Sequence, residues 1–242
     1  MKRVIIIGAT SGIGHELAEK YAAQGWMVGI AGRREEELQR LQSTSPKTIF
    51  YETLDVTHEN ATDILHQLIE KSGGMDLFLL CSGIGSQNLS LTPDIELKTA
   101  ATNVEGFIRM VTAAFHYFED KPNGHIAVIS SIAGTKGLGS APAYSATKRF
   151  QNTYIEALTQ LAYMNKLNIR FTDIRPGFVA TPLLKDRKYP LLMKAPEVAS
   201  HIIRAIERNR KVVVIDWKYS IIVFFWKFIP RWLWIKMNVR NQ

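Results

Sequence analysis

Residues 4–14 read VIIIGATSGIG, an uninterrupted β-branched run that leads directly into a glycine-rich loop. Such a run is typical of a central strand in a parallel sheet, because that strand is buried on both faces. Glycines let the backbone turn sharply and approach a phosphate, whose charge then rests on the N–H groups that begin the next helix. Strand, glycine loop and helix together predict a doubly wound α/β domain that binds a dinucleotide.

Further apolar runs extend this pattern along the chain. Strands are expected at residues 26–31, 48–54, 76–80, 125–129, 168–174 and 211–215, and helical spacing separates them. The alternation predicts a parallel sheet of about seven strands flanked by helices. A chain of 242 residues fits one such domain better than two, so residues 1–215 are expected to form it and residues 216–242 a C-terminal tail.

Tyr144 and Lys148 are four residues apart, which places them on one face of a helix. A tyrosine that exchanges protons near neutrality needs its pKa lowered from about 10 to about 7, which corresponds to about 4 kcal/mol. An ammonium about 4 Å away supplies that energy at an effective dielectric of about 20. Ser131 follows the strand at 125–129, where α/β sheets bind ligands. The alternative is a surface tyrosine beside a solvated lysine.

Several motifs in order resemble the short-chain dehydrogenase/reductase family, in its single-domain branch. They are the glycines of 8–14, an NxxG at 103–106, Ser131, the YxxxK of 144–148 and a PGxVxT at 176–181. The resemblance implies a Rossmann-type fold, a homodimer or homotetramer formed through two long helices, and interconversion of a carbonyl and an alcohol. It also implies the catalytic tetrad Asn103, Ser131, Tyr144 and Lys148, in which Tyr144 exchanges the proton, Lys148 lowers its pKa, Ser131 polarises the carbonyl and Asn103 holds a water of a proton relay.

The end of the second strand indicates which dinucleotide is used. Sites for NAD usually place an acid there, whereas an arginine accommodates the 2′-phosphate of NADP. This chain has Gly32-Arg33-Arg34, so NADP is favoured over NAD, although Ser11 stands where many NADP-using relatives have a base, and the arginines could simply open a charged helix. The cofactor-binding residues implied are Gly8, Thr10, Ser11, Gly12, Ile13, Gly14, Arg33, Arg34, Asp55, Val56, Cys81, Gly83, Tyr144, Lys148, Pro176, Gly177, Val179 and Thr181.

One site departs from the family pattern, because Leu80, Cys81 and Ser82 replace its usual Asn-Asn-Ala before Gly83. We expect a repacked strand end with Cys81 as a buried structural thiol. As the single cysteine, Cys81 allows no internal disulfide, so a reducing cytoplasmic location is expected. The sequence predicts no metal site.

The last two segments bear on substrate and partners. Residues 182–194 correspond to a substrate lid and mix leucines with Lys185, Arg187 and Lys188, which suits an apolar substrate with an anionic head or a solvated loop. The tail holds four of the five tryptophans and half of the net charge of +8. It is too interrupted to span a membrane, and aromatic and basic residues together favour peripheral contact with an anionic membrane over a dimer contact or a flap over the pocket.

Two functions of other classes are the alternatives to an oxidoreductase. One is a catalytically silent NADP-binding sensor, and the other is a membrane-associated scaffold. The complete tetrad argues against the sensor, because a binding module needs neither Tyr144 nor Ser131. The scaffold would be distinguished by membrane fractionation with and without residues 217–242, together with unimpaired cellular function after Tyr144→Phe. Nucleic-acid binding is not expected, since the basic residues outside the tail follow no groove-reading motif.

Overall fold

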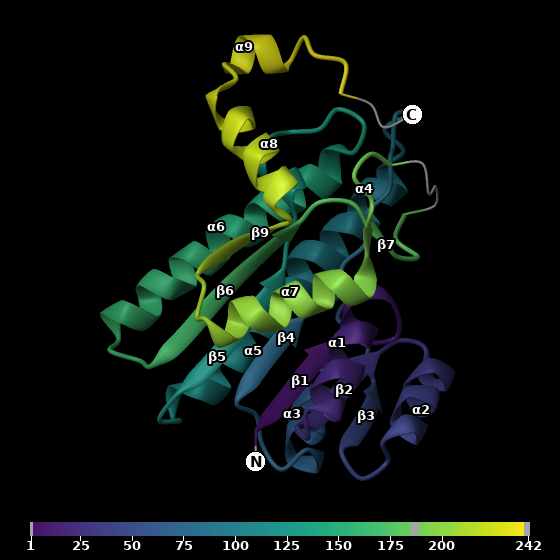
Figure 1. Ribbon diagram of the computed structural model, residues 1–242, viewed down its shortest axis with the longest axis vertical. Helices are drawn as coiled ribbons and strands as arrows, with labels where there is room; N and C mark the ends of the chain where they lie inside the picture. Colours follow the sequence, from purple (N-terminus) through teal and green to yellow (C-terminus); the bar gives the residue numbers. More distant parts are fainter. Residues whose placement is uncertain (1, 185–188, 240–242) are drawn as a thin grey trace.

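The computed structural model describes residues 2–184 and 189–239. A parallel seven-stranded sheet of order β3-β2-β1-β4-β5-β6-β9 forms its centre (Figure 1). The strands are β1 (Arg3–Ile7), β2 (Met27–Gly32), β3 (Ile49–Thr53), β4 (Leu77–Leu80), β5 (Gly124–Ile129), β6 (Ile169–Pro176) and β9 (Val212–Ile215). The strand order reverses between β1 and β4, and such a reversal opens a crevice at the carboxyl ends of the strands.

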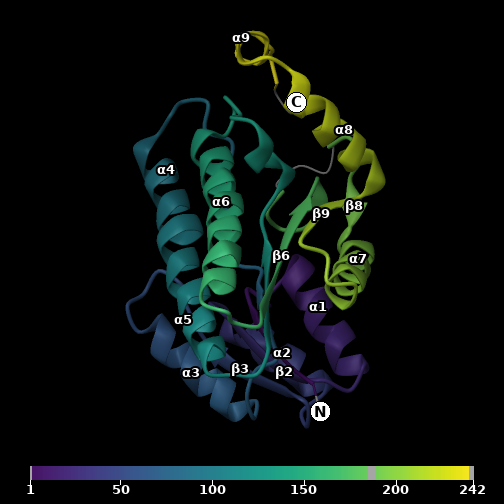
Figure 2. The ribbon, with the colours of Figure 1, turned by 90° about the vertical axis from the view of Figure 1, so that its left-hand side faces the viewer.

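Helices cover both faces of this sheet. On one face lie α1 (Gly12–Ala23), α2 (Glu35–Thr44) and α7 (Ala195–Glu207), and on the other lie α3 (Ala61–Lys71), α5 (Phe107–Glu119) and α6 (Pro142–Met164), as the edge-on view of Figure 2 shows for most of them. Along β1, Ile5 packs in the core beneath α3 and α5, while Ile6 packs in the core beneath α1 and α7. The predicted doubly wound fold is therefore confirmed.

The helical stretch that carries the NxxG of 103–106 is divided into two parts. The π-helical segment η1 (Ala101–Gly106) precedes α5, and it continues directly from α4 (Pro93–Ala100), a helix that the sequence analysis did not predict. Pro93 stands in the first turn of α4, where the missing N–H costs nothing. The wider turn of η1 carries Asn103 fully buried, which agrees with the frequent occurrence of π-helical turns at functional sites.

The chain ends in two short helices at the carboxyl ends of the strands. Asp216 accepts a hydrogen bond from the Lys218 N–H and so starts α8 (Trp217–Phe228), and Pro230 then separates α8 from α9 (Arg231–Trp234). Both helices lie at the end of the molecule opposite the amino terminus (Figures 1 and 2). Among the described residues, no helix is long and apolar enough to cross a lipid bilayer. We call residues 217–239 the C-terminal segment.

Candidate active site

A cleft of about 1090 Å³ opens at the carboxyl ends of the strands. The loops that follow β1, β2, β4, β5 and β6 line it, and the C-terminal segment adds part of the wall. All the residues that the sequence analysis expected to bind the cofactor lie along this cleft, and so do Ser131, Tyr144 and Lys148. Asn103 is the exception, because it lies behind the wall and is fully buried.

The glycine loop is shaped to receive an anion. Gly8 and Gly12 have φ of +92° and +59°, which residues with a Cβ rarely adopt. A Cβ on Gly14 would lie 2.2 Å from the Gly8 carbonyl oxygen, so the loop closes only with glycine there. In the described chain the Ser11 hydroxyl does not cap α1, which leaves the first N–H groups of that helix beside the cleft. These features fit the pyrophosphate of a dinucleotide.

Two arginines follow β2 at the rim of the cleft. Arg34 donates to the Thr10 carbonyl oxygen at 3.0 Å and to the Thr10 hydroxyl at 2.9 Å, so its guanidinium is fixed over the glycine loop. Arg33 is more than half exposed, and its Nη1 lies 4.0 Å from Asp55 Oδ2. Burial alone would raise the pKa of Asp55, but two hydrogen bonds from Thr57 and the charge of Arg33 together hold it below its usual value. Asp55 is therefore a carboxylate at neutral pH.

The end of β5 and the first turns of α6 bring Ser131, Tyr144 and Lys148 together. The Ser131 hydroxyl lies near enough to the Tyr144 phenol to influence its pKa. Lys148 Nζ lies 5.8 Å from the centre of the Tyr144 ring and is buried. It donates to the Ile129 carbonyl oxygen at 3.0 Å, so the ammonium group is anchored to the strand that carries Ser131.

The surroundings of Tyr144 in the protein alone do not give its phenol the lowered pKa that was expected. Burial raises the pKa of Tyr144, and the hydrogen bond with Ser131 opposes that rise only in part. Burial also lowers the pKa of Lys148 to about 8, against the opposing effect of Asp173. The physical reason is that exclusion of water disfavours the charged form of each side chain, the phenolate of Tyr144 and the ammonium of Lys148. The ammonium, moreover, lies beside the ring and donates to other oxygens.

Gln151 is a site residue that the sequence analysis missed. Its Oε1 accepts from Lys148 Nζ at 2.9 Å, and its Nε2 donates to the Asn103 carbonyl oxygen at 2.9 Å. The Asn103 side chain bonds both backbone groups of Ile84 and the Thr147 hydroxyl. A glutamine amide therefore joins Lys148 to the Asn103 carbonyl oxygen. A spacing of three residues places Gln151 beside Lys148 on one face of α6, but this spacing belongs to no motif that could have singled it out.

A second buried network, also missed, holds α6 against the sheet. The Ser130 hydroxyl donates to Asp173, and Asn152 Nδ2 donates to Ser130 Oγ at 2.9 Å and to Asp173 Oδ2 at 3.0 Å. Arg175 Nη2 completes it at 2.6 Å from Asp173 Oδ2. These contacts join the ends of β5 and β6 to the helix that carries Tyr144, so they fix the spacing between Ser131 and Tyr144.

The strand end that departs from the family pattern remains part of the cleft. Cys81 lies in the wall as a partly exposed residue whose thiol is buried, and its N–H donates to the Ile7 carbonyl oxygen at 2.8 Å. Burial of the thiol raises its pKa to about 12, so it is not a thiolate near neutrality. A Cβ on Gly83 would lie 3.4 Å from both Asn103 Oδ1 and Lys148 Nζ, which places this glycine between the two.

The C-terminal segment is fastened to the cleft by two side chains. The Tyr219 hydroxyl accepts from the Phe178 N–H at 3.2 Å and lies 3.0 Å from the Pro190 carbonyl oxygen, to which it donates. Trp234 Nε1 donates to the Gly137 carbonyl oxygen at 2.7 Å, in the loop that follows Ser131. Tyr219 thus connects the segment to the described part of the expected lid. The lid residues Lys185, Arg187 and Lys188 and the tail residue Arg240 lie outside the described residues.

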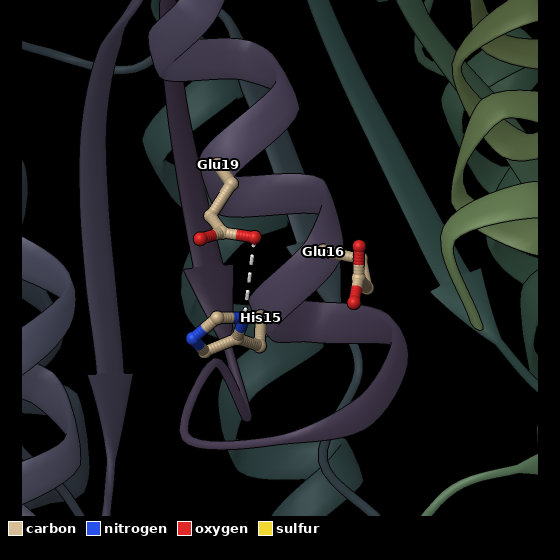
Figure 3. Close-up of side chains that lie close together, drawn as sticks. All are labelled: His15, Glu16 and Glu19. Atoms are coloured by element: carbon tan, nitrogen blue, oxygen red, sulfur yellow. Dashed lines mark ion pairs between the residues drawn. The ribbon is translucent and has the colours of Figure 1, made fainter. Parts of the chain in front are cut away.

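One group of potential metal ligands lies on α1. The ligand atoms of His15, Glu16 and Glu19 are within 4.8 Å of one another. Figure 3 shows His15 and Glu19 pointing toward each other, with 3.6 Å between Nδ1 and Oε2, while Glu16 projects separately. A helical i,i+4 ion pair accounts for this arrangement.

The comparisons with known proteins agree with this geometry. A family model described as short chain dehydrogenase matches residues 2–190. An uncharacterized oxidoreductase of Myxococcus xanthus is 30% identical over 95% of this chain and 93% of its own length. Dehydrogenase/reductase SDR family member 7B of Xenopus laevis is 27% identical over 99% of this chain and 81% of its own length.

Solved structures share the fold. The 3-ketoacyl-(acyl-carrier-protein) reductase of Brucella melitensis, complexed with NADH, superposes with a TM-score of 0.80 over 89% of this chain and 96% of its own, at 23% identity. A short chain dehydrogenase/reductase of Burkholderia phymatum, in complex with NAD, has a TM-score of 0.82 over 92% of each chain, at 20% identity. The chain belongs to the short-chain dehydrogenase/reductase family. It is an oxidoreductase that depends on a nicotinamide dinucleotide.

Proposed function

We propose that this protein is an NADP(H)-dependent oxidoreductase that interconverts a ketone or aldehyde and an alcohol, with Tyr144 as the general acid and base. The observation that carries the proposal is the convergence of Ser131, Tyr144 and Lys148 on one cleft with the glycine loop. Proton exchange requires a donor within hydrogen-bond reach of the carbonyl oxygen. Ser131 and Tyr144 present two such hydroxyl groups on the wall of the same cleft.

Each residue has a distinct part in the proposed reaction. A nicotinamide dinucleotide held along the glycine loop would supply the hydride for the carbonyl carbon. Ser131 holds the carbonyl oxygen through its hydroxyl, and Tyr144 gives that oxygen its proton. Lys148, held by Ile129 and Gln151, keeps a positive charge beside the phenol and favours the phenolate that proton transfer leaves.

The preference for NADP rests on the arginines after β2. A 2′-phosphate is bound well by the planar, multi-donor guanidinium group. Arg34 is already fixed on Thr10, and Arg33 lies at the rim with more than half of its side chain exposed. Gly32 offers no carboxylate for a ribose hydroxyl, because its place at the end of β2 carries no side chain. Asp55, beyond Arg33, is engaged by Thr57.

The substrate and the assembly follow from the walls of the cleft and from the remaining surface. Leucines of 183–191 and aromatic residues of the C-terminal segment line the substrate end, which supports an apolar substrate. We place the enzyme in the cytoplasm, as a homodimer or homotetramer built on the long helices α5 and α6. We also place its C-terminal segment against an anionic membrane.

Transfer of deuterium tests the reaction class. NADPH deuterated at the reactive carbon of the nicotinamide is incubated with the protein and a panel of apolar ketones and aldehydes, and the alcohols are analysed by mass spectrometry. The proposal predicts an alcohol that carries one deuterium on its carbinol carbon. Binding of NADPH without deuterium transfer to any carbonyl of the panel would favour the sensor instead.

A further inference from the structure

The C-terminal segment has an inner face that belongs to the cleft. Tyr219, Ile222 and Trp226 line the cleft from α8, and Trp234 of α9 packs on Trp226 with 5.3 Å between the ring centres. Tyr219, Val223 and Trp234 are nearly buried. The segment is therefore a fixed wall of the substrate end.

The outer face of the same segment is aromatic and exposed. Seven large apolar side chains on it are between 48% and 71% exposed, namely Trp217, Ile221, Phe224, Phe225, Phe228, Trp232 and Ile235. The rings of Phe224 and Phe228 lie 5.0 Å apart and those of Phe224 and Phe225 lie 5.6 Å apart, so they form one continuous patch. Contiguous apolar patches of this kind mark interaction sites.

Charge indicates which partner this outer face fits. Lys218, Lys227, Arg231 and Lys236 are exposed around the patch, and residues 217–239 contain no Asp or Glu. Each basic residue near an anionic lipid surface contributes about 1 kcal/mol. A second copy of the chain would instead bring four positive charges against the same four, because a twofold interface pairs a patch with itself. An anionic bilayer therefore fits the face better than a second copy does.

We propose that the outer face docks on an anionic bilayer, and that this docking lets the cleft take its carbonyl substrate directly from the lipid. The proposal rests on the proposed reductase function and adds the source of its substrate. An α-helix is only about 10 Å across, and the inner and outer faces of α8 lie on opposite sides of it. A substrate dissolved in the bilayer is therefore separated from the cleft by only one helix, α8. Its class is a carbonyl compound with a membrane-partitioning hydrocarbon chain.

Vesicle binding tests the docking step. The full-length protein is sedimented with vesicles of phosphatidylcholine alone or mixed with phosphatidylglycerol. Lys227→Glu/Arg231→Glu should weaken binding to the anionic vesicles by at least about 30-fold, from about 1 kcal/mol for each lost cation. Phe224→Ser/Phe225→Ser should weaken binding to a similar or greater extent. Lys47→Glu and Tyr163→Ser, which alter exposed residues outside the segment, are the matched controls and should bind as the wild type does.

Turnover tests the source of the substrate. A short ketone in solution should be reduced equally by the wild type and by Phe224→Ser/Phe225→Ser, since neither residue lines the cleft. A long-chain ketone held in anionic vesicles should be reduced at least about tenfold faster by the wild type. Equal rates on the vesicle ketone, or equal vesicle binding by the variants and the controls, would overturn the proposal. The proposal would also be overturned if the wild type formed a dimer that the outer-face variants, but not the control variants, dissociate. If the wild type did not reduce the short ketone, the proposed reductase function would be refuted, whereas the vesicle-binding measurement would still test the docking step.

Discussion

Replacement of Gly177 by Ala measures how closely the C-terminal segment packs on the cleft. A Cβ there would lie 2.2 Å from Tyr219 Cζ and 2.3 and 2.4 Å from the two Cε atoms, against ordinary contacts of 3.4–4 Å. The ring must retreat by about 1.2 Å, the difference between these distances. It is held in place because its hydroxyl accepts a hydrogen bond from the Phe178 N–H and donates one to the Pro190 carbonyl oxygen. Overpacking of this kind costs about 1–3 kcal/mol.

The net effect is smaller than the clash, because alanine restricts the unfolded chain and recovers about 0.4–1 kcal/mol. We expect Gly177→Ala to lower the free energy of unfolding by about 1–2 kcal/mol, which corresponds to a fall in Tm of about 2–8 °C for a chain of this length. Urea unfolding of Gly177→Ala, Tyr219→Ala and the double variant forms a complete cycle. Removal of the ring should remove the penalty at Gly177, whereas an equal loss in both backgrounds would refute this packing.

The remaining predictions concern the cofactor, the lysine and the core. Arg33→Gln should weaken NADPH binding by about 10- to 150-fold, which is the range for a hydrogen bond to a charged group, and should leave NADH binding unchanged. Fluorescence titration with both cofactors measures this, and an equal loss for NADPH and NADH would indicate general damage to the site instead. Gln151→Met removes an acceptor from Lys148, so the alkaline limb of the kcat/KM profile should move to lower pH, and Gln151→Glu should move it higher. Burial lowers the pKa of His125 to about 4, so the unfolded chain takes up a proton at this residue at a higher pH than the folded protein does. The free energy of unfolding is therefore unaffected by this residue above about pH 6.5, and up to about 3 kcal/mol of it is lost as the pH falls toward 4. The free energy of unfolding, measured with urea, should differ less between pH 7 and pH 4.5 in His125→Gln than in the wild type. An equal difference in both proteins would contradict the assignment of this pH dependence to His125.

The fold and the outline of the cleft could be predicted because their signals are local. Val4–Ile7 is continuously apolar since both faces of β1 are buried, and Gly8, Gly12 and Gly14 meet backbone constraints that glycine satisfies best. The family motifs, which are also local, implied that Ser131 and Tyr144 would share one site.

Other features depend on contacts that local patterns do not encode. Gln151 belongs to no motif, and its role appears only when η1 brings the Asn103 carbonyl oxygen beside it. The raised pKa of Tyr144 depends on burial by distant parts of the chain. The two faces of α8 are both apolar, so periodicity in the sequence could not separate Tyr219, which packs on Gly177, from exposed Phe225.

The most direct test of the proposed mechanism compares Tyr144→Phe with the wild type on whichever carbonyl compound gives turnover. The phenyl ring keeps the packing of α6 and removes only the phenolic hydroxyl that faces the cleft. The account predicts that Tyr144→Phe binds NADPH with the affinity of the wild type and loses turnover by about 10²–10⁴-fold, as expected when a general acid is removed. A near-normal rate with normal NADPH binding would contradict the assignment of Tyr144 as the proton donor.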